Sequence, residues 1–158
     1  MHHAPALLAA NRSIPACSVI PVLHYPDVAA AASWLCHAFG FSKRLRIGDH
    51  RVQLTIGSGA LVIAQAEITQ ADGAHSVMVR VADVDHHHAV AARAGARIAA
   101  APVTYPYGER QYSAVDPGGH HWTFTQTVAD VDPADWGGDW LDDEDADPTP
   151  PRPRRPLA

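Results

Sequence analysis

The stretch Tyr107–Gln126, YGERQYSAVDPGGHHWTFTQ, decides how this chain is interpreted. Its centre, Asp116-Pro117-Gly118-Gly119, is typical of a tight turn, because proline presets the backbone angle at the first turn position and glycine accepts a positive φ without steric cost. After the turn, side chains alternate with the period of two that is typical of a strand with two unlike faces. One face carries Trp122, Phe124 and Gln126, and the other carries His121, Thr123 and Thr125. The aromatic face suits a core, and the small polar face suits the wall of a cavity.

Length and composition place the chain among globular proteins of one domain, or of two small modules that share a core. It has 158 residues, of which 47% are hydrophobic. No apolar run approaches the roughly 18 residues that span a bilayer, and no signal peptide is evident. The two cysteines, Cys17 and Cys36, are too few for a disulfide framework, so we expect a reduced, cytoplasmic protein.

The net charge of −5 is concentrated near the C-terminus. Residues 18–131 carry nine acidic and eight basic residues, whereas residues 132–158 carry eight acidic and three basic ones. A nearly neutral domain without a basic stripe argues against nucleic-acid binding. We therefore expect a lead-in at 1–17, a domain at 18–131 and an acidic, proline-rich tail at 132–158. The tail favours an extended segment beyond Leu141, with Trp136 packed on the domain or on a partner.

The same order of elements occurs twice. Each time, a strand leads to an aspartate that can cap a helix, the helix ends at a glycine, and three strands follow. The capping residues are Asp27 and Asp83, and the glycines are Gly40 and Gly95. The expected strands are 18–24, 41–47, 51–56 and 60–65, then 75–81, 97–101 and the two that flank the 116–119 turn. A duplicated βαβββ unit, with modules 18–66 and 75–131, is the simplest account, because one unit alone could not cover both faces of its sheet.

Three segments carry a resemblance to a known family: IPVLHYPDVAAAASWLCHAFGF, VRVADVDHHHAVAARAGARI and the opening stretch. In this order they resemble the vicinal oxygen chelate superfamily, which contains glyoxalase I, extradiol dioxygenases and bleomycin-resistance proteins. The opening stretch is similar to the closing hairpin of bleomycin-resistance-like and PhnB-like members. The resemblance implies an α+β fold of two tandem βαβββ modules whose curled mixed sheets form a cup, often in a homodimer that shares the cup between chains.

Metal-using members of this family place ligands on the first and last strand of each module. The resemblance assigns these positions to Ile20 and Ser76, seven residues before the capping aspartates, and to Ile63 and Thr123, four residues after a turn glycine. Isoleucine cannot bind a metal ion, and serine or threonine is a poor replacement for histidine or glutamate. Because a divalent ion needs three or more good donors, we expect no metal ion and no cofactor.

Counting along the same strands gives the residues expected to line the cup. They form an apolar wall with a few polar anchors, the usual composition of a small-molecule pocket. Arg80 could pair with a carboxylate or phosphate of the ligand, or it could extend into solvent. Tyr107 could close over the cup or pack on the sheet edge. The expected lining is Ile20, Val22, His24, Leu61, Ile63, Gln65, Ser76, Met78, Arg80, Tyr107, His121, Thr123 and Thr125.

Three functions stay open on the sequence. The leading hypothesis is a metal-independent protein that sequesters an apolar or aromatic small molecule, as a homodimer, with no nucleic-acid or membrane partner. The second is a glyoxalase-like lyase or isomerase that uses a relocated metal site or acid–base chemistry by His24, His121 and Glu109. The third is an interaction module whose cup is filled by its own side chains. The run His86–His88 is expected at the surface or in packing, because adjacent helical residues point in different directions.

Overall fold

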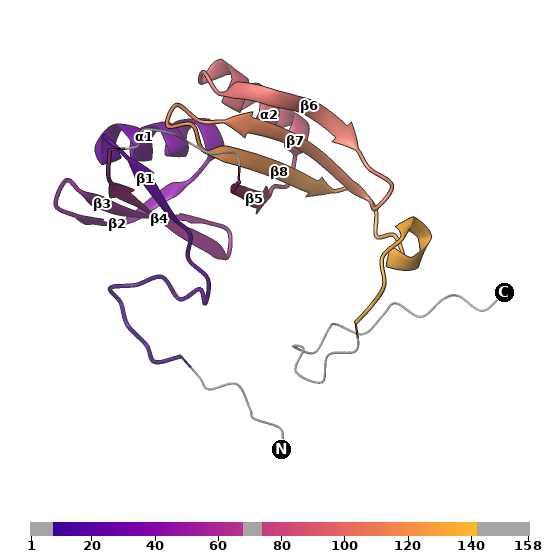
Figure 1. The fold of residues 1–158 in the computed structure, drawn as a ribbon, viewed down its shortest axis with the longest axis horizontal. Helices are drawn as coiled ribbons and strands as arrows, with labels where there is room; N and C mark the ends of the chain where they lie inside the picture. Colours follow the sequence, from indigo (N-terminus) through magenta and orange to yellow (C-terminus); the bar gives the residue numbers. More distant parts are fainter. Residues whose placement is uncertain (1–7, 68–73, 142–158) are drawn as a thin grey trace.

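The structure is a computed structural model that describes residues 8–67 and 74–141. It contains two modules, each with a four-stranded sheet and one helix (Figure 1). Module 1 consists of β1 (Val22–Tyr25), α1 (Val28–Phe39), β2 (Ser42–Ile47), β3 (Arg51–Ile56) and β4 (Gly59–Gln65). Module 2 consists of β5 (Ser76–Arg80), α2 (Val84–Arg93), β6 (Arg97–Thr104), β7 (Glu109–Val115) and β8 (His121–Thr127). A short 3-10 helix, η1 (Pro133–Trp136), follows.

The two sheets have the same topology, with strand orders β1-β4-β3-β2 and β5-β8-β7-β6. In each, the first strand pairs in parallel with the last, and the remaining pairs are antiparallel. The predicted α+β fold of two tandem βαβββ modules is therefore confirmed. The sheets stay open and do not close into a barrel.

Both helices begin where the sequence predicts. The side chains of Asp27 and Asp83 each accept a hydrogen bond of 3.0 Å from the backbone N–H three residues later. Helix α1 ends at Gly40, whose φ of 83° is in the left-handed region that favours glycine. Helix α2 ends with Ala94 as its C-cap, and Gly95, with φ of 92°, turns the chain toward β6.

Several strands differ in length from the prediction. Strand β1 begins at Val22 rather than at residue 18, because pairing with β4 starts at the Pro21 carbonyl, which accepts a hydrogen bond of 2.9 Å from the Val62 N–H. Proline itself has no N–H to contribute to the ladder. Strands β6 and β7 are longer than predicted, since their pairing continues to Thr104 opposite Arg110.

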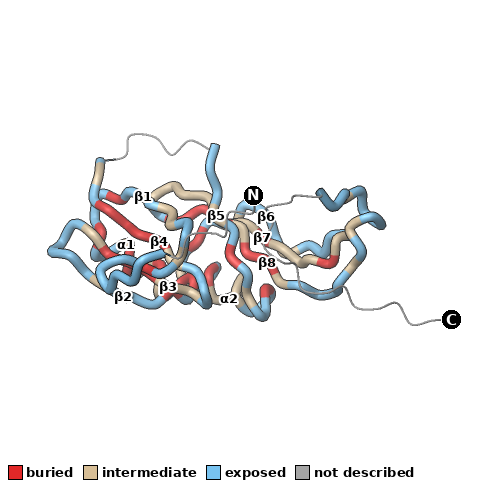
Figure 2. Tube along the Cα trace, turned by 90° about the horizontal axis from the view of Figure 1, so that it is seen from below, coloured by how far each residue is buried: buried red, intermediate tan, exposed pale blue. Residues whose placement is uncertain are grey.

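The hydrophobic core joins the two modules. The ring of Phe39, at the end of α1, has its centroid 5.3 Å from that of Trp122 and 4.7 Å from that of Phe124, both on β8. All three side chains are fully buried. From α2, His87 adds a fourth ring, 4.2 Å from Phe124. The core is thus built by elements of both modules, and Figure 2 shows buried residues along the strands of each.

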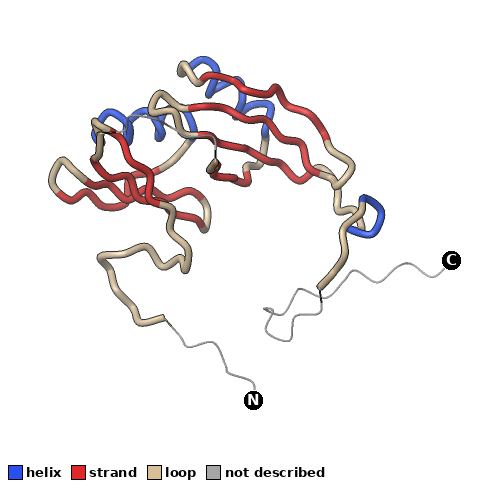
Figure 3. Tube along the Cα trace, in the orientation of Figure 1, coloured by secondary structure: helices blue, strands red, loops and turns tan. Residues whose placement is uncertain are grey.

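Both helices lie on the same side of the two sheets (Figure 3). The opposite side of each sheet carries none of the described helices, and we call it the open face. None of the helices in the described ranges is long and apolar enough to cross a membrane.

Beyond β8, η1 returns to the domain. The ring of Trp136 lies 5.4 Å from that of Tyr107, so the expected contact of Trp136 with the domain is confirmed. Tyr107 also stacks on Tyr105, with centroids 5.3 Å apart and planes at 4°. The extended segment predicted for 142–158 lies outside the described residues.

Candidate functional site

Strand β8 presents two unlike faces, as its sequence predicts. Trp122 and Phe124 are fully buried in the core against the helices. Because successive strand residues point to opposite faces, the residues between them belong to the open face. These open-face residues are His121, Thr123 and Thr125.

Strand β5 extends the same surface. Val77 and Val79 pack against the core, so Ser76, Met78 and Arg80 lie on the open face. The parallel register places Met78 beside Thr123 and Arg80 beside Thr125. The Met78 side chain is 61% exposed, which gives the middle of this face an apolar surface.

A hydrogen-bonded network gives the open face a polar end. The Thr125 hydroxyl, in a residue only 2% exposed, donates to Glu109 Oε1 at 2.8 Å and accepts from Gln111 Nε2 at 3.2 Å. The Tyr107 hydroxyl donates to Gln111 Oε1 at 3.2 Å. The network holds the Glu109 carboxylate at the N-terminal end of β7, where it can accept a hydrogen bond from a ligand.

Arg80 lies at the same end of the face and is exposed. Its Nη2 donates to Thr127 Oγ1 at 3.2 Å, and no described carboxylate pairs with it. A guanidinium has five N–H donors, so most of them stay available to an anionic group. Both predicted alternatives for Arg80, solvent exposure and anion pairing, are compatible with this position.

Module 1 places only part of the predicted wall on its open face. Val22 and His24 lie there, because Leu23 and Tyr25 pack into the core. Leu61 and Ile63, at 2% and 0% exposure, belong to the core cluster instead. Gln65 pairs with Tyr25 and therefore lies on the face of the sheet that carries the core residues. Ile20 precedes β1 and is not part of the sheet.

The corrections for Leu61, Ile63 and Gln65 on β4 have one physical cause. Strand β4, GALVIAQ, is apolar on both faces, so its phase cannot be read from alternation. The residues of β4 that lie on the open face are Val62 and Ala64, which are 5% and 8% exposed. We infer that another segment of the chain covers this part of the sheet.

The N-terminal strap, residues 11–17, provides this cover. It runs below the strands of module 1 in Figure 1, and Pro15 is buried in it. Gln53 is 4% exposed and pairs with Val62 across β3 and β4, so it too faces this side. Its Nε2 donates to the Ser13 carbonyl at 2.8 Å.

Arg44 fastens the strap at a second point. Its guanidinium donates to Gln53 Oε1 and, through Nη2 at 3.0 Å, to the Arg12 carbonyl. The strap is therefore bound over part of the open face of module 1, whereas Val22 and His24 stay exposed there. On the open face of module 2, Met78 and Arg80 are exposed.

The residues of the open faces do not fit the metal site of the catalytic relatives. The four positions assigned from the sequence hold Ile20, Ile63, Ser76 and Thr123, and the corrected β4 positions hold only Val62 and Ala64. Across residues 8–67 and 74–141, no group of three or more His, Cys, Asp or Glu side chains is arranged to hold a metal ion. A divalent ion in a protein usually has three or more such donors.

The residues considered for acid–base chemistry are not brought together by hydrogen bonds. His24 lies on β1, His121 begins β8, and the Glu109 side chain bonds only to Thr125 within the described part of the chain. The nearby His120 Nε2 contacts the His24 carbonyl at 2.8 Å, which is a structural link between the modules.

The His86–His88 run serves packing, as predicted. His87 Nε2 lies 2.9 Å from the Phe39 carbonyl, so this nitrogen carries the proton, and Nδ1 accepts from the Tyr112 hydroxyl at 2.6 Å. Burial disfavours the charged ring and lowers the pKa of His87. His88 packs edge-on against Tyr112, with centroids 5.1 Å apart.

Sequence reasoning missed a buried polar cluster at the turn of module 2. The Asp116 carboxylate, in a residue 4% exposed, accepts from Tyr25 Oη at 2.5 Å, from Trp122 Nε1 at 3.0 Å and from the His120 N–H at 3.0 Å. Burial, and then the negative charge of Asp116, raise the pKa of Tyr25 far above its usual value. The aspartate is visible in the turn motif, but its partner 91 positions earlier has no sequence signal.

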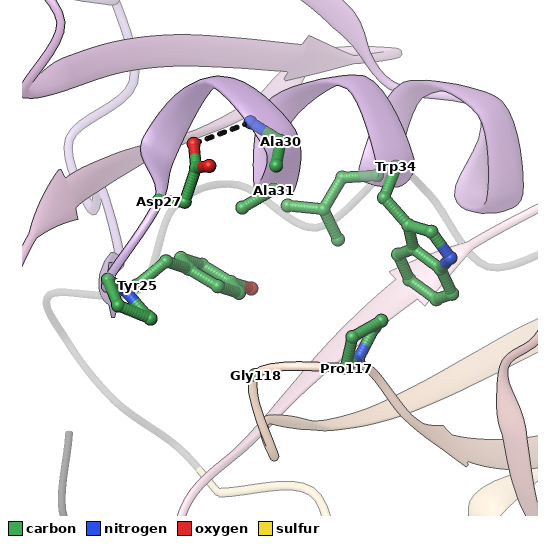
Figure 4. Close-up of a pocket in the computed structure, with 9 residues that line it drawn as sticks. Tyr25, Asp27, Ala30, Ala31, Trp34, Pro117 and Gly118 are labelled. Carbon is green, nitrogen blue, oxygen red and sulfur yellow. Dashed lines mark hydrogen bonds between the residues drawn. The ribbon is translucent and has the colours of Figure 1, made fainter.

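A pocket of about 270 Å³ lies between α1 and this turn (Figure 4). Trp34 and Leu35 line it from α1, and Pro117 and Gly118 line it from the turn. Its lining is almost wholly apolar. The remaining lining residues are Tyr25, Pro26, Asp27, Ala30 and Ala31.

Comparisons with solved structures agree with this architecture. TioX from Micromonospora sp. ML1 is 32% identical, with a TM-score of 0.60, over 73% of this chain and 100% of that one. The fosfomycin resistance protein FosX from Mesorhizobium loti is 14% identical, with a TM-score of 0.56, over 68% and 89% of the two chains. Lactoylglutathione lyase from Agrobacterium tumefaciens is 18% identical, with a TM-score of 0.55, over 70% and 94%. The last two share the fold alone.

No curated protein matches the sequence significantly. The sequence profile of one family, however, matches residues 20–124, which span both modules from β1 to β8. The chain therefore belongs to the glyoxalase/bleomycin resistance protein/dioxygenase superfamily.

Proposed function

We propose that this protein binds a small, largely apolar molecule on the open face of module 2 and does so without a metal ion. The observation that carries this proposal is the chemistry of the strand positions that face the cup. They hold Val22, Val62, Ser76 and Thr123, while the surrounding superfamily frame is kept. These four positions offer apolar contact and hydrogen bonds but no strong metal ligand.

The arrangement on the open face favours an aromatic ligand with one acidic group. Rings of the ligand would lie on the exposed Met78, since thioether and aromatic groups attract each other. A carboxylate would pair with the guanidinium of Arg80, and a hydroxyl or amide of the ligand would donate to Glu109.

We further propose that a second copy of the chain completes the cup. Met78 and Val103 on module 2 are 61% and 49% exposed, so the face is open to solvent in a single chain. Covering one such side chain stabilises an assembly by roughly 1.5–3 kcal/mol.

Metal content tests the first half of the proposal. The histidines at 2, 3, 86 and 88 are first replaced by glutamine to remove adventitious binding, while His87 is kept because its ring packs in the core. Elemental analysis is then expected to find far less than one divalent ion per chain. One ion per chain that survives mild chelation would overturn metal independence.

Ligand binding tests the second half, with 1-naphthoate as the probe. Titration calorimetry is expected to give saturable binding that Met78→Glu and Arg80→Gln each weaken at least tenfold. Val128→Glu is the matched control, because Val128 is 45% exposed but lies beyond the end of β8. Equal binding by all three variants would rule out the open face of module 2 as the site.

The strap favours a second candidate function, an interaction module whose cup is partly filled by its own chain. It already covers Gln53 and Val62 on module 1. In that case 1-naphthoate would not bind to the full chain.

A further inference from the structure

We propose that the pocket between α1 and the 116–119 turn is a second ligand site, which takes a small uncharged molecule of one or two aromatic rings. None of the residues that line this pocket belongs to the open face of module 2. It opens where the first turns of α1 meet the hairpin of the other module (Figure 4). A ligand here would contact both modules at once.

The walls of the pocket are held in place before any ligand arrives. Trp34 Nε1 donates to the Ala94 carbonyl at 2.9 Å, and Tyr25 Oη donates to Asp116. Both rings therefore use their polar atoms inside the protein and leave only carbon surface toward the pocket. Binding against these two rings orders few side chains and leaves the polar atoms of Trp34 and Tyr25 with their partners.

Size and shape limit the ligand to a few fused or single rings. An engineered apolar cavity of roughly 150 Å³ binds benzene, and this pocket is larger, at about 270 Å³. Beside Trp34 and Leu35, the helix offers the small side chains of Ala30 and Ala31, which leave room for a flat ring. On the other side lie Pro117 and Gly118. Gly118 has no side chain that could fill the space.

Charge separates this site from the open face. Asp27 stands at the N-terminus of α1 and lines the pocket. Its Oδ1 accepts the helix-capping hydrogen bond from the Ala30 N–H, as Figure 4 shows, and its second oxygen accepts no hydrogen bond from the described residues. A carboxylate at the rim repels anions and accepts from an N–H or O–H group. The pocket therefore selects a neutral ring with one donor, whereas Arg80 makes the open face suited to an anion.

Indole is the probe, and methyl NMR of the full chain is the measurement. Titration is expected to shift the methyl signals of Ala30 and Ala31 in a saturable way, with one site per chain. The Met78 methyl signal should stay unchanged, because it lies on the open face.

Three variants complete the test. Ala30→Leu fills the pocket and is expected to weaken indole binding at least tenfold. Ala29→Leu is its matched control, since Ala29 is exposed on the same helix but does not line the pocket. Met78→Glu alters the open face and should leave indole binding unchanged, which separates this site from the proposed function.

The proposal fails if Ala30→Leu and Ala29→Leu bind indole equally, or if the shifts fall on Met78 instead. It also fails if Ala30→Leu changes the molecular mass of the assembly in light scattering while Ala29→Leu does not. That result would show that a second copy of the chain covers the pocket.

Discussion

The Tyr25 hydroxyl donates a hydrogen bond of 2.5 Å to Asp116 Oδ2, and both residues are less than 5% exposed. Tyr25 ends the first strand of module 1, and Asp116 begins the last turn of module 2. The same carboxylate holds Trp122, in the middle of the shared core. One buried carboxylate thus links the two repeats. Because its donors Tyr25 and Trp122 are also buried, water cannot readily take their place.

Tyr25→Phe is expected to lower the free energy of unfolding by about 1–3 kcal/mol. The substitution keeps the ring but leaves the buried Asp116 carboxylate with one donor fewer. Urea unfolding followed by tryptophan fluorescence measures the change. Tyr105→Phe is the matched control, because Tyr105 is 39% exposed. Equal stability of the two variants would contradict a stabilising role for this hydrogen bond.

Gly118→Ala should also destabilise the protein, by about 1–3 kcal/mol, through overpacking. A Cβ at this position would lie 2.6 Å from Tyr25 Cε1, and the Tyr25 ring cannot move away because its hydroxyl is bound. Gly59→Ala serves as the control, since its nearest neighbour would be the Ile56 carbonyl oxygen at 3.4 Å. Thermal unfolding of both variants measures the difference in their stability. A Gly118→Ala protein as stable as Gly59→Ala would disagree with the described contact.

Stability is expected to fall with pH in the range where His87 gains a proton. The folded state keeps His87 neutral, so its pKa is lowered there, whereas the unfolded chain titrates near the usual value of about 6.5. The unfolded state then binds more protons, and the free energy of unfolding decreases as the pH falls below about 6.5. The loss continues down to the folded pKa of His87.

Urea unfolding between pH 7.5 and 5 of His87→Gln and His86→Gln measures this contribution. His86 is exposed, and its charge is a smaller cause of the lowered pKa of His87 than burial, so His86→Gln should keep most of the pH dependence of the parent protein. His87→Gln should show a smaller one. If both variants kept the same dependence, another group would be responsible.

Release of the N-terminal strap should uncover apolar surface on module 1. Arg44→Ala removes the guanidinium that holds Gln53 and the Arg12 carbonyl, and it is expected to raise the fluorescence of an added anilinonaphthalene sulfonate dye. Arg12→Ala is the control, because Arg12 takes part in this contact only through its backbone carbonyl. No difference in dye fluorescence between the two variants would show that Arg44 does not hold the strap.

The sequence predicts the order of elements and the faces of module 2 because its signals there are local. Asp27 and Asp83 cap their helices, and the alternation in β8 separates Trp122 and Phe124 from Thr123 and Thr125. Each of these signals depends on residues a few positions apart, which a sequence shows directly.

Module 1 was harder to predict because a distant segment covers it. The apolar strand β4 gives no phase by itself, and the strap is bound to Gln53, the partner of Val62 on β3, through Ser13, which lies 40 residues before Gln53. The contact of Tyr25 with Asp116 and the pocket beside it likewise combine segments from both modules. No local pattern encodes such long-range contacts.

The aromatic core has a consequence for the chain as a pair of repeats. Phe39 belongs to module 1, yet it packs against Trp122 and Phe124 of module 2. A fragment that contained only one module would expose these rings and aggregate. Co-expressed as two separate polypeptides, the halves should instead find each other and reassemble, so that the protein can serve as a split pair whose association reports that both halves are present.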